Sequence, residues 1–254
     1  MKIHLQSDMH IEFGGVPEQS AVADVYVCAG DIGLLSHPAD LDEYFDGIKD
    51  NCDHIIWVLG NHEFYHGVYE DVLGMARDLA KNHGVHLLDI ELGTQDLEID
   101  GVKFWGTTFW TDLHKHDWFA HKKIQDGLND FHVIKHKNHY RNFSAHESYE
   151  INKKSRELIN WDADVIITHH CPIDIEHPKF PRSEITYAFV NTGLEEQIID
   201  SDVKYWLYGH THHSTVSDVY GTLVVSNQRG YDKGATSYGW AEECGFDPNL
   251  ILEI

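Results

Sequence analysis

The chain has 254 residues, of which 42% are hydrophobic and 24% are charged, an ordinary composition for a globular protein. Acidic residues outnumber basic ones by 42 to 19, so the formal net charge is −23. A surface this negative repels acidic membranes and nucleic-acid backbones. No apolar run approaches the ~20 residues that a membrane span needs. No signal-peptide pattern precedes the first strand-like run, so we expect a cytoplasmic protein without membrane partners.

Short apolar runs that are typical of strands recur along the chain and end abruptly in polar clusters. They occupy residues 3–6, 24–29, 54–59, 164–168 and 203–208. Continuous runs of this length indicate strands that are covered on both faces. Two further segments, 97–104 around Asp100-Gly101 and 215–226 around Gly221, alternate in polarity and predict hairpins.

Helical periodicity appears between these runs, at residues 39–49, 68–81 and 146–161. The alternation of strands and helices predicts an α/β protein with layered sheets. We expect a single domain over residues 1–254. The segment of about 107–145 has no sustained period and is interpreted as a cap-like insertion. The four cysteines form no Cys-x-x-Cys pair and are expected to be free thiols, with a metal contact left open for Cys171.

The polar clusters at the ends of the strand-like runs supply carboxylates, imidazoles and one amide. Ligands of α/β sheets bind outside the carboxyl ends of the strands, so these side chains are expected to meet there. Carboxylate and imidazole donors suit Mn, Fe or Zn better than Mg or Ca. Two such ions clamp a phosphoryl group and share a hydroxide nucleophile. The predicted metal ligands are Asp8, His10, Asp31, Asn61, His169, His210 and His212.

The spacing within the clusters suggests how they reach one cavity. In Asp8-x-His10 and His210-x-His212, residues two apart on an extended segment point the same way. Glycines precede Asp31, Asn61 and His210. We expect them to allow sharp turns and a close approach of the backbone to the metals.

The order Asp-x-His, Gly-Asp, Gly-Asn-His-Glu, His and Gly-His-x-His resembles the calcineurin-like metallophosphoesterase superfamily. The resemblance extends from Asp8 to His212, and the five blocks in this order are highly specific. It implies two packed mixed β-sheets flanked by helices, and a hydrolase with two divalent cations.

The resemblance also implies roles for individual residues. The first metal would be held by Asp8, His10, Asp31 and His212, and the second by Asp31, Asn61, His169 and His210. Asp31 would bridge the two cations and is therefore expected to be catalytically essential. His62 would lie outside the metal ligands, where it stabilises the transition state or protonates the leaving oxygen.

The sequence departs from the protein serine/threonine phosphatases of this superfamily, which carry Gly-Asp-x-x-Asp-Arg-Gly and Arg-Gly-Asn-His-Glu. Leu34 and Leu35 replace the Asp-Arg pair, and Leu59 replaces the arginine before Gly-Asn-His-Glu. The sequence looks closer to the bacterial phosphodiesterase-like branch. We therefore expect a small phosphodiester or phosphomonoester as substrate. A metallonuclease and a non-catalytic scaffold of the same fold are the alternatives, although nucleic acid fits the charge poorly.

Several assignments stay open at the level of the sequence. Each of the aspartates and histidines, taken singly, is commonly an ordinary turn or packing residue. His169 is favoured over His170 because it directly follows the strand. Substrate contacts are possible for Arg229 and for a group in the cap-like insertion: His114, His116, His136, His139 and Arg141. The sequence does not determine the oligomeric state, the native metal or the ester.

Overall fold

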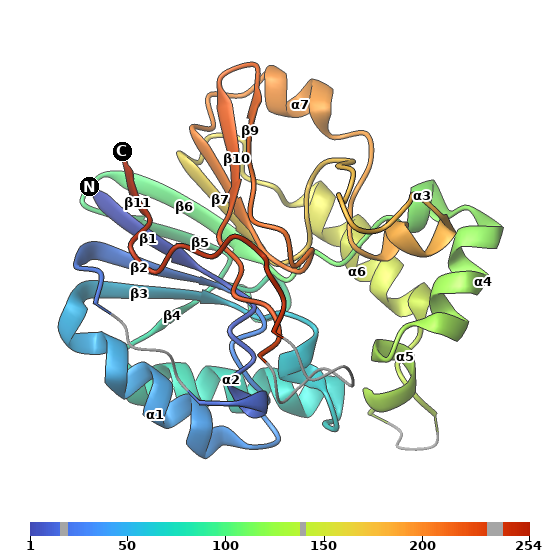
Figure 1. Ribbon diagram of the computed structural model, residues 1–254, viewed down its shortest axis with the longest axis horizontal. Coiled ribbons are helices and arrows are strands. Elements are labelled where there is room, and N and C mark those ends of the chain that lie inside the picture. Colours follow the sequence, from blue (N-terminus) through green and yellow to red (C-terminus); the bar gives the residue numbers. More distant parts are fainter. Residues whose placement is uncertain (16–19, 138–140, 233–240) are drawn as a thin grey trace.

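The strands of the computed structural model, which describes residues 1–15, 20–137, 141–232 and 241–254, form two sheets packed face to face (Figure 1). In the five-stranded sheet the strand order is β11-β1-β2-β3-β4, and only β11 runs antiparallel to its neighbour. Its strands are β1 (Lys2–Gln6), β2 (Ala23–Ala29), β3 (Cys52–Val58), β4 (His86–Leu87) and β11 (Ile251–Glu253).

The second sheet has six strands in the order β5-β6-β7-β8-β10-β9, with antiparallel strands at both edges of a parallel centre. Its strands are β5 (Asp96–Ile99), β6 (Val102–Thr107), β7 (Val165–Thr168), β8 (Tyr205–Tyr208), β9 (Val216–Val219) and β10 (Thr222–Ser226). The predicted fold of two packed mixed sheets with flanking helices is confirmed.

The strands are apolar on both faces because each sheet is covered on both sides. In β2, Val25 and Val27 face the other sheet, whereas Tyr26 and Cys28 belong to the core beneath the helices. All four side chains are fully buried. This double coverage explains why the central strands read as continuous apolar runs rather than as an alternating pattern.

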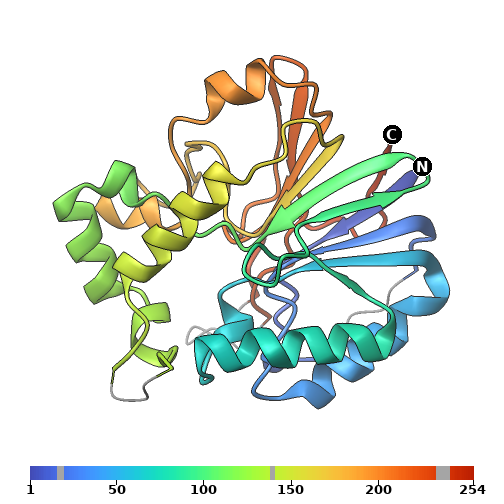
Figure 2. The ribbon, with the colours of Figure 1, turned by 180° about the vertical axis from the view of Figure 1, so that it is seen from behind.

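Helices cover the outer faces of the sheets (Figure 2). The helices are α1 (Pro38–Ile48), α2 (Tyr69–His83), α3 (Leu113–His116), α4 (Trp118–Gly127), α5 (Asp130–Val133), α6 (Ala145–Glu157) and α7 (Glu195–Ile199). Single 3₁₀ turns are η1 (Ile11–Phe13), η2 (Lys49–Asn51), η3 (His62–Phe64) and η4 (Glu184–Ala188). Among the described residues, no helix combines the length and the apolar character needed to cross a bilayer.

The predicted helices 39–49 and 68–81 correspond to α1 and α2, but α6 ends four residues before the predicted limit of 161. A capping box formed by Ser144 and Glu147 starts α6. Beyond its end, the Asn160 side chain accepts a hydrogen bond from the backbone N–H of Asp162. Such a local bond stabilises a turn in place of further helix.

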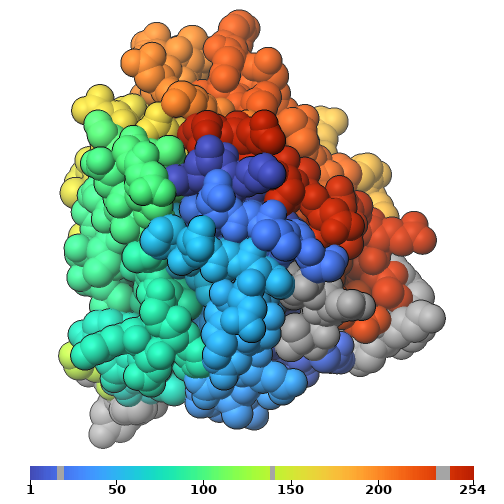
Figure 3. Space-filling view, turned by 90° about the vertical axis from the view of Figure 1, so that its left-hand side faces the viewer, coloured from blue at the N-terminus to red at the C-terminus, as the bar shows by residue number. Residues whose placement is uncertain are grey.

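Both predicted hairpins are present. Asp100 and Gly101 have φ values of 49° and 82° between β5 and β6, as a tight two-residue hairpin turn requires. The C-terminal strand β11 was not predicted. It pairs with β1 and brings Ile254 to within 2.7 Å of the Met1 amino group, so both termini lie on one face (Figure 3).

The segment predicted as a cap, 107–145, begins where β6 ends and contains α3, α4 and α5. These helices lie to one side of the sheets (Figures 1 and 2). The four residues of α3 have φ values between 48° and 60°, which makes α3 a left-handed turn rather than a normal helix. Residues 107–145 together form the cap segment. Its status as an insertion within a single domain stays a prediction.

The four cysteines are free thiols, as predicted. Burial raises the pKa of Cys171 to about 12. Its Sγ hydrogen-bonds to the carbonyl oxygen of Ile173, so this thiol has a local partner in the fold.

Candidate metal centre

The predicted ligands lie together at the carboxyl ends of parallel strands from both sheets. Asp8 and His10 follow β1, Asp31 follows β2, and Asn61 follows β3. In the second sheet, His169 follows β7, and His210 and His212 follow β8. Six of the seven residues are buried. The strand ends of both sheets lie at one edge. Potential ligands from a stretch of 205 residues (residues 8–212) therefore come together there.

The local backbone differs from the extended conformation that the spacing suggested. Asp8 and His10 have φ values of 52° and 46°, and His210 and His212 have values of 71° and 49°. The expectation that these pairs point the same way because their backbone is extended is therefore wrong. Left-handed turns direct the side chains instead. Such conformations are costly for residues other than glycine and often mark functional sites.

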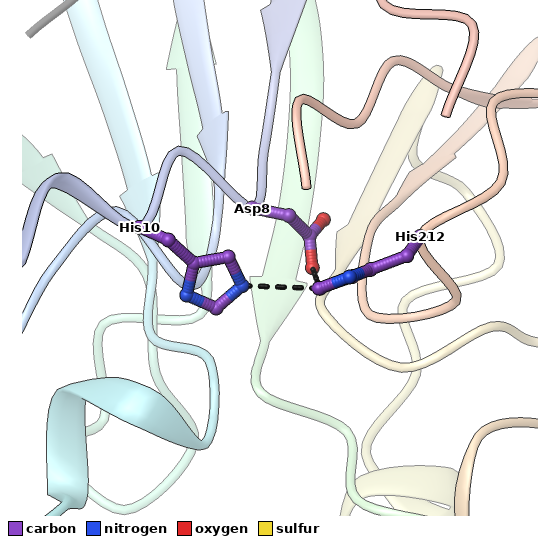
Figure 4. A group of neighbouring side chains, drawn as sticks. All are labelled: Asp8, His10 and His212. Carbon is purple, nitrogen blue, oxygen red and sulfur yellow. Dashed lines mark hydrogen bonds and ion pairs between the residues drawn. The ribbon is translucent and has the colours of Figure 1, made fainter. Parts of the chain in front are cut away.

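The first donor group comprises Asp8, His10 and His212 (Figure 4). Nε2 of His212 lies 3.0 Å from Nε2 of His10 and 3.5 Å from Oδ1 of Asp8. Nδ1 of His10 is hydrogen-bonded to Glu12, and Nδ1 of His212 to Glu242. In the neutral tautomers that a metal requires, with Nδ1 as the donor, the Nε2 lone pair of each ring would face the other ring. A cation between them removes this repulsion, so the group fits a metal ion.

The second donor group comprises Asp31, His169 and His210. Nε2 of His169 lies 3.4 Å from Oδ2 of Asp31 and 3.2 Å from Nδ1 of His210. The carbonyl oxygen of Asn61 lies 3.0 Å from the same Nε2 atom. Nδ1 of His169 bonds to the carbonyl oxygen of Ala29, which can only accept, so Nε2 carries the lone pair in the neutral ring. With Nδ1 of His210 as an acceptor too, four acceptors around one point again fit a cation.

Asp31 lies between the two groups. Its Oδ2 atom is 3.8 Å from Nε2 of His10 and 3.4 Å from Nε2 of His169. Its Oδ1 atom accepts a hydrogen bond from the backbone N–H of His62. The carboxylate is thus placed where it contacts donors of both groups.

The carboxylates of the centre stabilise positive charge on two of its imidazoles, those of His169 and His212. Burial opposes the ionisation of Asp31, but the neighbouring His169 and His62 hold its pKa well below the ordinary value. Burial also opposes protonation of His169, yet Asp31 raises the pKa of that imidazole to about 9. For His212, the carboxylates of Asp8 and Glu242 outweigh burial and raise the pKa to about 10. A site that holds protons this tightly is also suited to metal cations.

His170, the alternative to His169, lies apart from these donor groups. Its Nδ1 atom bonds to the carbonyl oxygen of Thr108. Its ring packs against Trp110 and His210, with centroid distances of 5.2 and 4.1 Å. Burial and the neighbouring His169 lower the pKa of His170 to about 3. The residue is therefore a buried neutral packing partner of the centre.

Glu63, in the Gly-Asn-His-Glu block, connects two of the loops. Its carboxylate accepts hydrogen bonds from the backbone N–H groups of Asp31, Ile32 and Gly60 at 2.8–3.0 Å. A side chain on Gly60 would overlap the Asp31 carboxylate and lie 2.8 Å from the His169 ring. The glycine is therefore required by the close approach of two loops.

His62 adjoins the centre without a free ring nitrogen. It lies in a compact group with His10 and Asp31, but its Nδ1 atom bonds to Glu12 at 2.9 Å. Its Nε2 atom lies 3.3 Å from the hydroxyl group of Tyr231. Burial lowers the pKa of His62, but the nearby carboxylates of Asp31 and Glu12 outweigh it and raise the pKa overall.

Within the described part of the chain, four residues near the centre were not predicted from the sequence. Glu12 contacts both His10 and His62, and Asp130 contacts Asn61. Tyr231 contacts His62, and Glu242 contacts His212. Glu12 has a weak local signal, since it follows His10 by two residues. The other three come from distant segments that carry no recognisable motif.

The described residues that were left open as substrate contacts have partners within the fold. Arg229 donates to the carbonyl oxygen of Met9 at 2.7 Å and pairs with Asp232 at 3.6 Å. It therefore ties the loop that carries His10 to the segment before Tyr231.

In the cap segment, Arg141 pairs with Glu147 at 2.6 Å, and His136 lies 3.2 Å from the same carboxylate. The rings of His114 and His116 stack on Tyr187 and Tyr149. His139 lies outside the described residues.

Comparisons with known proteins identify the family of the chain. Residues 1–214 match the family model described as calcineurin-like phosphoesterase. Protein L509 of Acanthamoeba polyphaga mimivirus is 27% identical over 98% of this chain and 95% of its own length. The crystal structure of the phosphopantetheinyl hydrolase PptH from Mycobacterium tuberculosis superposes with a TM-score of 0.64. It shares 15% identity, over 97% of this chain and 96% of that chain. The chain belongs to the calcineurin-like phosphoesterase family and is a metal-dependent hydrolase of phosphoric esters.

Proposed function

We propose that the protein hydrolyses a small phosphodiester or phosphomonoester with two divalent cations. The observation that carries the proposal is the position of Asp31 between two donor groups. The first cation would be held by Asp8, His10, Asp31 and His212. The second would be held by Asp31, Asn61, His169 and His210. Imidazole, carboxylate and amide donors favour Mn, Fe or Zn over Mg or Ca.

The cations would neutralise the phosphate oxygens and lower the pKa of a bound water molecule. The chain itself positions the donors. Glu12 holds the Nδ1 protons of His10 and His62 through one carboxylate oxygen, at 3.2 and 2.9 Å. These bonds fix the orientation of both rings, and Nε2 of His62 then lies 3.3 Å from the hydroxyl group of Tyr231. Nε2 of His62 is then the atom that donates a proton to the leaving oxygen or stabilises the transition state.

The proposed substrate is small and carries its own negative charge. The net charge of −23 disfavours a long polyanion, which supports a small ester over nucleic acid. The branch that resembles bacterial phosphodiesterases, manganese as the metal and a cytoplasmic location remain predictions from the sequence. The activity named for PptH applies to that protein.

Metal analysis and a substrate panel test this proposal. Elemental analysis after metal-supplemented expression is expected to give close to two transition-metal ions per chain. Hydrolysis of bis-p-nitrophenyl phosphate, p-nitrophenyl phosphate and cyclic nucleotides is then compared with added Mn²⁺. A folded protein with no bound metal, or with no activity on any of these esters, contradicts the proposal. Cleavage confined to DNA or RNA, with a steep salt dependence, would favour the metallonuclease alternative.

A further inference from the structure

Asp130 links the cap segment to the centre. It is the first residue of α5 and is 3% exposed. Its Oδ1 atom accepts a hydrogen bond from Nδ2 of Asn61 at 2.9 Å and one from the hydroxyl group of Tyr65 at 2.7 Å. These partners precede it by 69 and 65 residues, so its carboxylate reaches across the fold to the loop after β3.

The position of Asp130 is fixed by backbone hydrogen bonds that join the two segments. The N–H of Lys135 donates to the carbonyl oxygen of Gly67, and the N–H of Tyr69 donates to the carbonyl oxygen of Lys135, both at 2.9 Å. These bonds attach the chain just after α5 to the chain between η3 and α2. Asp130 therefore approaches Asn61 from a docked element rather than from a free loop.

A carboxylate at this position selects one orientation of the Asn61 amide. A half-turn of the amide would exchange its oxygen and nitrogen atoms, and only the oxygen can bind a cation. The Asp130 carboxylate accepts hydrogen bonds when ionised, so it contacts the NH₂ group. The Asn61 oxygen is then directed at Nε2 of His169, 3.0 Å away. This is the orientation that the second donor group needs.

We propose that Asp130 is a positioning residue of the metal centre. Its carboxylate would hold the Asn61 oxygen toward the second cation, so that the affinity of the site for this cation depends on the cap segment. The proposal rests on the proposed dinuclear site. It assigns no contact between Asp130 and the cation or the substrate. Hydrogen-bond partners of metal ligands typically change metal affinity by about 10–100-fold when they are removed.

Calorimetric titration of the metal-free protein with Zn²⁺ or Mn²⁺ tests this role through binding itself. We expect Asp130→Asn, which keeps the size but removes the charge and can turn its own amide, to weaken one of two binding steps by about tenfold. Asp130→Ala is expected to weaken the same step by up to about 100-fold. The other step should stay near the wild-type affinity. Asp126→Asn is the matched control, because this exposed residue of α4 pairs with Lys122 within the cap segment.

The outcomes separate the two proposals. Wild-type protein that binds fewer than two cations contradicts the dinuclear function itself. If wild-type protein binds two cations and Asp130→Asn binds both with unchanged affinity, only the role of Asp130 is overturned. The conservative variant decides this question even if Asp130→Ala does not fold. An equal loss in Asp126→Asn would mean that cap charge, rather than the contact with Asn61, controls binding, and would also overturn the role.

Discussion

Asp31 and Asp89 are both buried aspartates that follow strands of the five-stranded sheet, β2 and β4. Asp31 lies beside imidazoles, with Nε2 of His169 3.4 Å from its carboxylate. Asp89 instead accepts backbone hydrogen bonds from Glu91 and Leu92 at 2.7 and 3.2 Å. The same residue type at similar strand ends therefore belongs to a donor cluster in one case and to a turn in the other.

The surroundings of Asp31 and Asp89 shift the pKa values of the two carboxyl groups in opposite directions. Burial opposes ionisation of both groups. At Asp31 the histidines outweigh burial and hold the pKa well below its ordinary value. At Asp89 burial outweighs the hydrogen bonds and raises the pKa to about 6. The buried carboxylate of Asp31 is thus kept ionised by nearby imidazoles, and burial alone does not fix the acidity of an aspartate.

The largest expected effect is that of Asp31→Asn. The substitution should lower activity by ~10²-fold or more, because the carboxylate that would neutralise both cations and fix their separation is lost. Turnover is measured at saturating Mn²⁺, with Asp89→Asn as the matched variant. Near-normal turnover of Asp31→Asn would show that Asp31 does not bridge the cations.

His62→Ala should keep the metals and lose turnover. For substrates with a poor leaving group, a fall of ~10²–10⁴-fold is expected from loss of a general acid. The loss should be much smaller for p-nitrophenyl esters, since p-nitrophenolate leaves without a proton. The exposed His37, whose side chain makes no capping bond to α1, provides the control His37→Ala. Equal losses on both substrates would indicate electrostatic stabilisation of the phosphate, and loss of metal would place His62 among the ligands.

Glu12→Gln should have a smaller, dual effect. It weakens the hydrogen bonds that orient His10 and His62, so both metal affinity and turnover should fall by about 10-fold to 100-fold. Metal titration and steady-state kinetics measure the two effects separately. The exposed Glu98 of β5 gives the control Glu98→Gln. Unchanged metal affinity together with unchanged kinetics would mean that Glu12 orients neither ring.

Asp89→Asn should leave activity unchanged and raise stability at neutral pH. The folded-state pKa of Asp89, about 6, lies above its ordinary value of 3.8. Its stabilising contribution is therefore present below pH 3.8 and is lost as pH rises through about 6. Asparagine keeps the acceptor for the turn and cannot ionise.

The size of this effect follows from linkage between protonation and folding. Urea unfolding at pH 7.5 should give a gain on the order of 1–3 kcal/mol, and at pH 4 the difference should nearly vanish. A variant that is less stable than wild type at pH 7.5 would show that the charge of Asp89 itself supports the turn.

Much of the fold could be predicted because it depends on local patterns. The apolar runs and helical periods located the main strands, α1 and α2, and the Asp100-Gly101 pair located a hairpin. The strand β11 escaped prediction because its pairing with β1 joins residues about 250 positions apart, and no local pattern encodes that partner. The left-handed turn at α3 was missed for a similar reason, since its residues are not glycines.

The sequence by itself determined the predicted ligands, because each lies in a short polar block at the end of an apolar run, and glycine precedes Asp31, Asn61 and His210. Only the tertiary structure decided how their orientations are set. Left-handed turns aim Asp8 and His10, and carboxylates from remote segments, Glu242 and Asp130, contact His212 and Asn61. Hydrogen bonds act over about 3 Å regardless of sequence separation, so these partners become identifiable only once packing has brought them together.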